Sequence, residues 1–178
     1  MNYSAKVLDH FNNPRNTGRI DDYHGIGTIG DPGCGDFIEV TIQISPDNQM
    51  LEKVRYRIKG CPAAIATSSI TAEIAEGMPI DLALKLTDMD IVEALDGLPE
   101  NKIHCSLLAV RGLHLAIQDA ILKRLFIKAG IVKTDQEFEV LKAEGKLNEY
   151  FGGCDETSHH QCDGSCESSG FTYHNPLS

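Results

Sequence analysis

Three cysteines that lie far apart along the chain have the clearest chemical potential. Cys34 is in a glycine-rich turn sequence, Gly30–Asp36 (GDPGCGD), and Cys61 and Cys105 each stand where a helix is predicted to begin. Turns and helix starts are commonly exposed, and the unpaired N–H groups of a helix start favour a thiolate. We therefore predict that these three thiols bind one metal centre together.

Three neighbouring side chains extend this predicted site. The Asp36 carboxylate and the His104 imidazole are candidate fourth ligands, and Lys102 is a candidate to stabilise a thiolate or a persulfide. Each has a plainer interpretation: a hydrogen bond within the turn for Asp36, a helix cap or proton carrier for His104, and an exposed loop lysine for Lys102. A lone cysteine is also often a small buried apolar residue, and these three lack the local Cys-x-x-Cys spacing of a zinc or cluster motif.

Composition limits the class of protein. The 178 residues suit one domain with a short appendage, and the formal net charge of −10 argues against a nucleic-acid partner. The N-terminal residues lack an apolar signal region, and we expect no membrane-spanning segment and a soluble, cytoplasmic protein. In that reducing compartment six cysteines indicate metal binding or catalysis and not a disulfide framework.

The hydrophobic pattern places strands before the main helices. Apolar and polar residues alternate over 37–44 and 51–59, which predicts an antiparallel hairpin joined by a third strand over about 25–29. Helices are predicted over about 5–12 with a Ser4 cap, 61–77, 80–86, 91–95 with an Asp88 cap, and 104–129 with Ile117, Ile121 and Leu125 on one stripe. This order predicts an α+β fold, a three-stranded antiparallel sheet packed against helices.

An ordered set of motifs resembles the IscU/NifU-type iron–sulfur cluster assembly scaffolds, and the resemblance spans about residues 1–128. The segments that carry it are Tyr3–Val7 (YSAKV), Asn13–Asn16 (NPRN), Cys34–Asp36 (CGD), Lys59–Cys61 (KGC) with Ala64–Ser69 (AIATSS), and Leu98–Pro99 (LP) through Lys102–Ser106 (KIHCS).

The resemblance implies a function and a set of partners. Cys34, Cys61 and Cys105 would hold a transient [2Fe–2S] cluster, with Asp36 or His104 completing or tuning the site. A cysteine desulfurase would deliver sulfur as a persulfide to Cys105, and apo iron–sulfur proteins would receive the cluster, with a ferredoxin or another electron donor. Zinc can occupy the same site, since it accepts mixed sulfur, nitrogen and oxygen ligands.

Two segments depart from the family pattern. The loop Leu98–Lys102 reads LPENK where the family often has Leu-Pro-Pro-Val-Lys, which argues against an Hsp70-type handover partner. Pro62–Ala64 (PAA) follows Cys61 where the family often has Gly-Ser-Ala, so a backbone N–H and a hydroxyl that could bond a cluster sulfur are lost.

The C-terminal part lies beyond the resemblance. We predict a scaffold domain over 1–130, an additional helical segment over 131–151 and a flexible tail over 152–178. The helix should begin at the capping box Thr134–Glu137. A disordered tail and a second metal site are both open for the tail, whose candidate ligands are Cys154, His159, His160, Cys162 and Cys166.

Two other classes of function use the same cysteines. A zinc-dependent sulfurtransferase would carry persulfide on Cys105 without building a cluster. A Cys105–His104 hydrolase is disfavoured, because adjacent helical residues point about 100° apart. The prediction is a scaffold and not an enzyme in the strict sense.

Overall fold

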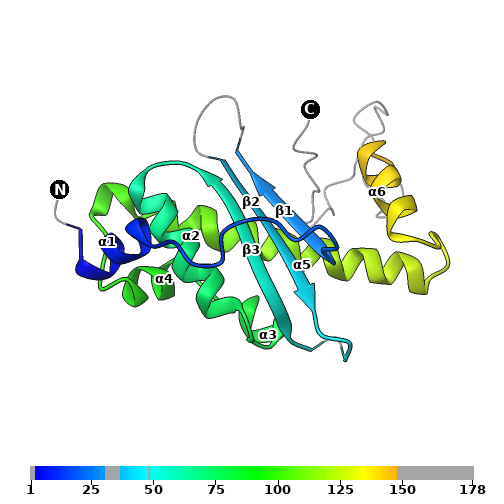
Figure 1. Cartoon of the computed structure of the whole chain (residues 1–178). Coiled ribbons are helices and arrows are strands. Elements are labelled where there is room, and N and C mark those ends of the chain that lie inside the picture. Colours follow the sequence, from blue (N-terminus) through cyan, green and yellow to red (C-terminus); the bar gives the residue numbers. More distant parts are fainter. Residues whose placement is uncertain (1–2, 31–36, 48, 148–178) are drawn as a thin grey trace, which may run out of the picture. The chain divides into compact units, whose positions relative to one another are not determined.

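Three antiparallel strands in the order β1-β2-β3 form the sheet of this protein (Figure 1). The computed structural model describes residues 3–30, 37–47 and 49–147. The strands are β1 (Gly25–Ile29), β2 (Phe37–Ile44) and β3 (Leu51–Lys59), as the alternating pattern predicts. In the register, Val40 of β2 pairs with Gly27 of β1 and with Tyr56 of β3.

The helices follow the predicted order. They are α1 (Ala5–Asn12), α2 (Pro62–Ala75), α3 (Ile80–Ala83), α4 (Asp88–Ala94), a 3-10 helix η1 (Glu100–Lys102), α5 (His104–Lys128) and α6 (Asp135–Ala143). The predicted α+β fold is confirmed. The described residues fall into two compact units, one ending at Arg124 and one beginning at Leu125. The three-part division at 130 and 151 stays a prediction.

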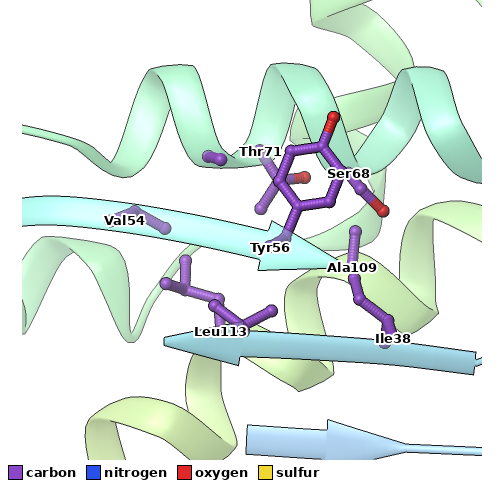
Figure 2. A pocket seen from close by; sticks show the side chains of 9 residues that line it. Ile38, Val54, Tyr56, Ser68, Thr71, Ala109 and Leu113 are labelled. Carbon is purple, nitrogen blue, oxygen red and sulfur yellow. The ribbon is translucent and has the colours of Figure 1, made fainter. Parts of the chain in front are cut away.

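One face of the sheet is covered by α2 and α5, which lie behind the strands in Figure 1. Inward residues of β2 and β3, such as Val40 and Tyr56, join Ala72 of α2 and Leu113 of α5 in the main core. A small cavity of about 10 Å³ remains between these elements (Figure 2). It is no larger than one water molecule, so the functional site must lie elsewhere.

Two glycines let α5 approach β1 unusually closely. A Cβ atom added at Gly25 would lie 2.1 Å from the Ala116 carbonyl oxygen, and one added at Gly27 would lie 2.2 Å from the Gly112 carbonyl oxygen. The neighbouring atoms are helix backbone and cannot move aside as a side chain can. Glycine at both strand positions is therefore required for the helix to seat against the sheet.

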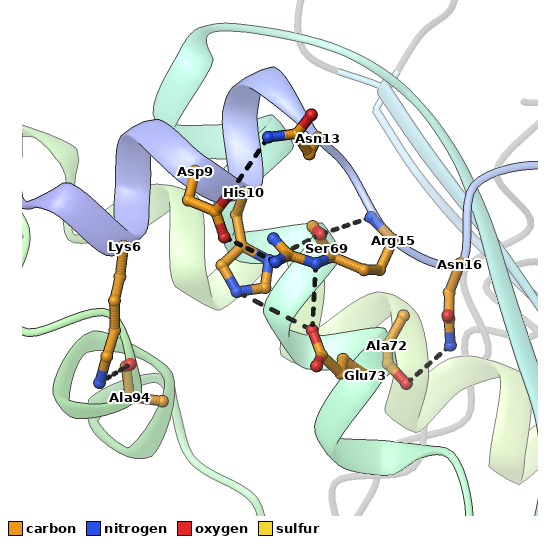
Figure 3. Close-up of polar contacts among 10 residues, drawn as sticks. All are labelled: Lys6, Asp9, His10, Asn13, Arg15, Asn16, Ser69, Ala72, Glu73 and Ala94. Atoms are coloured by element: carbon orange, nitrogen blue, oxygen red, sulfur yellow. Dashed lines mark hydrogen bonds and ion pairs between the residues drawn. The ribbon is translucent and has the colours of Figure 1, made fainter.

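A polar network ties α1 to α2 (Figure 3). The buried His10 Nδ1 lies 2.8 Å from the Ser69 hydroxyl oxygen, which also accepts from the Arg15 backbone N–H at 2.9 Å. The Ser69 hydroxyl of α2 thus contacts both α1 and the segment that follows it, and the His10 Nε2 atom faces the Glu73 carboxylate at 3.9 Å. Burial lowers the pKa of His10, which keeps the imidazole neutral.

The predicted stripe of α5 is wrong in part. Ile117 is fully buried, but Ile121 is 37 % and Leu125 is 55 % exposed. The physical reason is helix geometry, because each step of four residues turns the side chain by about 40° further around the axis. The part of α5 in the main core instead combines three alanines, which allow close packing, with a leucine and an isoleucine: Ala109, Leu113, Ala116, Ile117 and Ala120.

The cap of α4 also differs from the prediction. Thr87, not Asp88, is the N-cap, and it exchanges hydrogen bonds with Asp90 in a capping box. The hydroxyl and the carboxylate three residues later satisfy each other's backbone N–H groups, which leaves Asp88 as the first helical residue.

The unit that begins at Leu125 has its own small core. Phe126 and Phe138 pack edge to face with ring centroids 5.5 Å apart. The Thr134 hydroxyl caps α6 by accepting from the Glu137 N–H, as predicted. The Glu137 carboxylate, however, accepts from the Lys133 N–H at 2.6 Å, so the predicted capping box forms only in part.

The stretch Glu100–Lys128 is long and apolar enough to cross a membrane by length and composition alone. Its most apolar window has a mean hydropathy of 1.3 and is 61 % buried within the protein. Burial of this kind is typical of a core helix, and no membrane-spanning role follows from the length of this stretch.

We expect the substitution Gly27→Ala to lower the free energy of unfolding by about 2–3 kcal/mol, because the new methyl group would overlap the α5 backbone. Urea unfolding measures the change. Gly112→Ala is the matched control, since its nearest contacts would be side-chain atoms and not backbone, with Val40 Cγ2 at 3.1 Å and Ile38 Cγ2 at 3.5 Å, and alanine favours the helix. Equal losses in the two variants would contradict the close-approach interpretation.

Candidate metal centre

Two of the three predicted thiols meet where two helices begin. Cys61 is the N-cap of α2 and Cys105 is the second residue of α5, and their sulfur atoms lie 3.6 Å apart although 44 positions separate them in sequence. The sequence prediction that Cys61 and Cys105 come together is therefore consistent with this geometry.

The backbone around Cys61 leaves its sulfur free for chemistry. Its extended conformation, with φ −73° and ψ 166°, lets the Cys61 carbonyl accept from the Ile65 N–H while the side chain makes no capping hydrogen bond. Pro62 occupies the first helical position, where a missing N–H costs little. The departure from the family pattern at Pro62 is thus compatible with a well-formed helix start.

The two thiols differ in exposure. Cys105 is only 1 % exposed, whereas Cys61 is partly exposed. Ala63 and Ala64 are buried against Cys105, and partly buried apolar side chains flank this cluster from other elements: Tyr3, Ile58 and Leu98. The pair therefore has an apolar floor and opens toward solvent on the Cys61 side.

A hydroxyl group links the two helix starts. Thr67 Oγ1 of α2 lies 3.0 Å from the Ala64 carbonyl oxygen and 3.2 Å from the Cys105 carbonyl oxygen. The single hydroxyl proton is shared between the two acceptors, so the Cys105 backbone is tied to α2 two turns after Cys61. Sequence reasoning missed this residue, because its signal is a contact between distant segments.

Two other predicted site residues, His104 and Lys102, are among the described residues. His104 is exposed, and its Nε2 atom lies 3.6 Å from the Cys105 sulfur. The sequence alone predicts that these two side chains point apart, because they are adjacent in a helix. Lys102 is the last residue of η1. Its proposed effect on a thiolate remains a prediction.

The other predicted ligands lie outside the described residues. These are Cys34 and Asp36 of the turn, and Cys154, His159, His160, Cys162 and Cys166 of the tail. Over residues 3–30, 37–47 and 49–147, no group of three or more histidine, cysteine and acidic side chains is arranged to hold a metal ion. The described part of the site therefore consists of two adjacent thiols and a neighbouring imidazole, and the complete ligand set stays a prediction.

A family model described as the NifU-like N-terminal domain matches residues 2–125 of this chain. The chain belongs to that family. The matched region holds all three predicted cysteines and ends within α5, close to the boundary between the two compact units.

Curated relatives of the NifU-like chain support the same assignment. It is 44 % identical to the "Iron-sulfur cluster assembly scaffold protein IscU" of Aquifex aeolicus, over 85 % of this chain and 97 % of the relative. It is 42 % identical to the IscU scaffold protein of Escherichia coli, over 70 % of this chain and 98 % of that protein.

A solved structure supports the fold. The crystal structure of the N-terminal part of a nitrogen-fixing NifU-like protein from Brucella abortus superposes with a TM-score of 0.52 at 17 % identity, covering 67 % of this chain and 94 % of that one. At this identity the likeness concerns the three-stranded α+β fold alone.

We expect Thr67→Val to weaken cobalt(II) binding by about tenfold, because it releases the Cys105 backbone from α2 and loosens the thiol pair. A titration that follows thiolate-to-cobalt charge-transfer absorbance measures the affinity. Ser68→Ala is the matched control: its hydroxyl also donates to the Ala64 carbonyl, at 2.8 Å, but does not reach α5. A similar loss of affinity in both variants would mean that helix stability, not the link to Cys105, controls the site.

Proposed function

We propose that this NifU-like chain is an iron–sulfur cluster assembly scaffold. It accepts sulfur from a cysteine desulfurase and iron, builds a transient [2Fe–2S] cluster and transfers the cluster to apo-proteins. The observation that carries this proposal is the 3.6 Å approach of the Cys61 and Cys105 sulfurs, in a chain whose relatives are named as scaffold proteins.

The proposed metal ligands suit a cluster that is transferred to another protein. We assign Cys34, Cys61 and Cys105 as thiolate ligands, with Asp36 or His104 in the fourth position. Four thiolates favour a stable storage or electron-transfer cluster, whereas an oxygen or nitrogen ligand leaves one exchangeable position. The partly exposed Cys61 side gives such a position access to an acceptor protein.

Sulfur enters as a persulfide on Cys105, with Lys102 as the candidate stabilising cation. Because Cys105 is 1 % exposed, the desulfurase must displace covering groups to reach it. The remaining partners are apo iron–sulfur proteins and a ferredoxin or other electron donor, while the LPENK loop sequence argues against an Hsp70-type chaperone.

A zinc-dependent sulfurtransferase is the second candidate, because the same thiols bind zinc and carry persulfide. The hydrolase is less well supported. His104 reaches the Cys105 sulfur, but no third side chain among the described residues orients the imidazole as nucleophilic catalysis requires. The tail cysteines and histidines remain a predicted second metal site.

Anaerobic addition of ferric iron and inorganic sulfide to the metal-free chain tests the scaffold role. We expect visible and Mössbauer spectra of a [2Fe–2S] cluster, with bound cluster reduced at least about tenfold in each of Cys34→Ala, Cys61→Ala and Cys105→Ala, because each removes a thiolate ligand. Far-UV circular dichroism controls for misfolding of each variant.

The outcome also separates the two candidates. Tight zinc binding with a persulfide on Cys105 and no cluster would favour the sulfurtransferase. A cluster that survives loss of any one of the three thiols would contradict the assigned ligand set.

A further inference from the structure

The distance between the two thiols has a consequence for sulfur chemistry before any metal binds. We propose that Cys61 is the resolving thiol for a persulfide on Cys105 in the metal-free chain, so that metal occupancy decides whether delivered sulfur is kept or released as sulfide. This inference rests on the proposed function, because it requires a sulfur donor that loads Cys105.

The geometry places the Cys61 sulfur beside the atom it would attack. The 3.6 Å separation is just outside the ~3–3.5 Å of reacting atoms in a near-attack arrangement. Closing it to the ~2.05 Å of a disulfide needs a movement of about 1.5 Å. Cys61 can supply this movement, because its side chain makes no capping hydrogen bond and its position is the flexible end of a helix.

The step balances without an added reductant. The Cys61 sulfur bonds to the Cys105 sulfur, the bond from the Cys105 sulfur to the terminal sulfur breaks, and the electron pair leaves with the terminal sulfur. The protons of the Cys61 thiol and of the persulfide leave as hydrogen sulfide. The Cys61 sulfur is oxidised and the terminal sulfur is reduced, and a later dithiol reductant restores both thiols by exchange.

Metal binding would block this reaction. Cys61 cannot attack while its electron pair is donated to a metal, so a persulfide on Cys105 survives in the loaded site. The apolar floor of Ala63 and Ala64 hinders attack by outside thiols, and Cys61 is the thiol next to Cys105 among the residues that the structure describes. A chain without metal therefore releases the delivered sulfur as sulfide, and a chain with metal retains it as a persulfide.

The test uses the full chain, freed of metal and held anaerobically, with a cysteine desulfurase and cysteine, and separately with inorganic polysulfide. Peptide mass spectrometry locates extra sulfur and disulfides, and a colorimetric assay measures free sulfide. We expect a Cys61–Cys105 disulfide and one sulfide released for each disulfide formed. In Cys61→Ser the persulfide on Cys105 should persist, with sulfide release at least about tenfold slower, since the attacking thiol is gone.

Two further arms sharpen the result. Cys34→Ser tests the other site cysteine as the attacking group: the Cys61–Cys105 disulfide should still form in this variant if Cys61 is the resolving thiol. Zinc-saturated wild type should retain the persulfide.

The inference would be overturned by any of four results. These are a persulfide that persists in metal-free wild type, unchanged sulfide release in Cys61→Ser, extra sulfur on Cys61 in place of Cys105, and a disulfide from Cys105 to Cys34. The scaffold test supplies iron with inorganic sulfide and bypasses the persulfide. If the reconstitution forms a cluster but the persulfide test forms no Cys61–Cys105 disulfide, only this inference is contradicted. If the disulfide forms but no cluster does, the scaffold role is contradicted.

Discussion

The seating of α5 directly on the backbone of β1 is the constraint on which the rest of the structure depends. At Gly25 and Gly27 the carbonyl oxygens of α5 occupy the space where a Cβ atom would stand. This contact fixes the position of α5 against the sheet, and with it the position of Cys105 near the start of the helix. The second thiol follows from α2, which packs on the same face and begins at Cys61.

Two interactions then hold the thiols at a common point. The Thr67 hydroxyl ties the Cys105 carbonyl to α2, and the apolar cluster of Ala63, Ala64 and Cys105 closes the space beneath the sulfurs. Each helix start contributes unpaired N–H groups and partial positive charge near a sulfur, which suits an anionic cluster. The fold thus brings together two thiols from distant segments without a local Cys-x-x-Cys loop.

Local signals made much of the fold predictable from the sequence. The three strands follow from strict alternation, as in Ile38, Val40 and Ile42, and the cap at Ser4 follows from a hydroxyl before an apolar-periodic run. The Thr87 cap was missed because Asp88 beside it has a similar propensity. The face of α5 was misjudged because small residues, not the larger apolar ones, make the close contact with β1.

The site was predictable in its residues but not in its geometry. Nothing local shows that Cys61 and Cys105 lie 3.6 Å apart, or that His104 bends toward the Cys105 sulfur, because both facts depend on packing between α2 and α5. Thr67 carried no signal for the same reason. The prediction that these cysteines act together came from their motifs and from the family resemblance. The arrangement of α2 and α5 gives a physical reason for it.

The central claim is that this chain holds its cluster only to hand it on. The most direct test mixes the cluster-loaded chain with an apo-ferredoxin and an iron chelator, and follows the visible circular dichroism of the ferredoxin. The account predicts that the cluster passes to the ferredoxin before the chelator captures the iron, because an exchangeable ligand position lets the acceptor bind first. Retention of the cluster on this chain, or capture of all its iron by the chelator, would contradict the account.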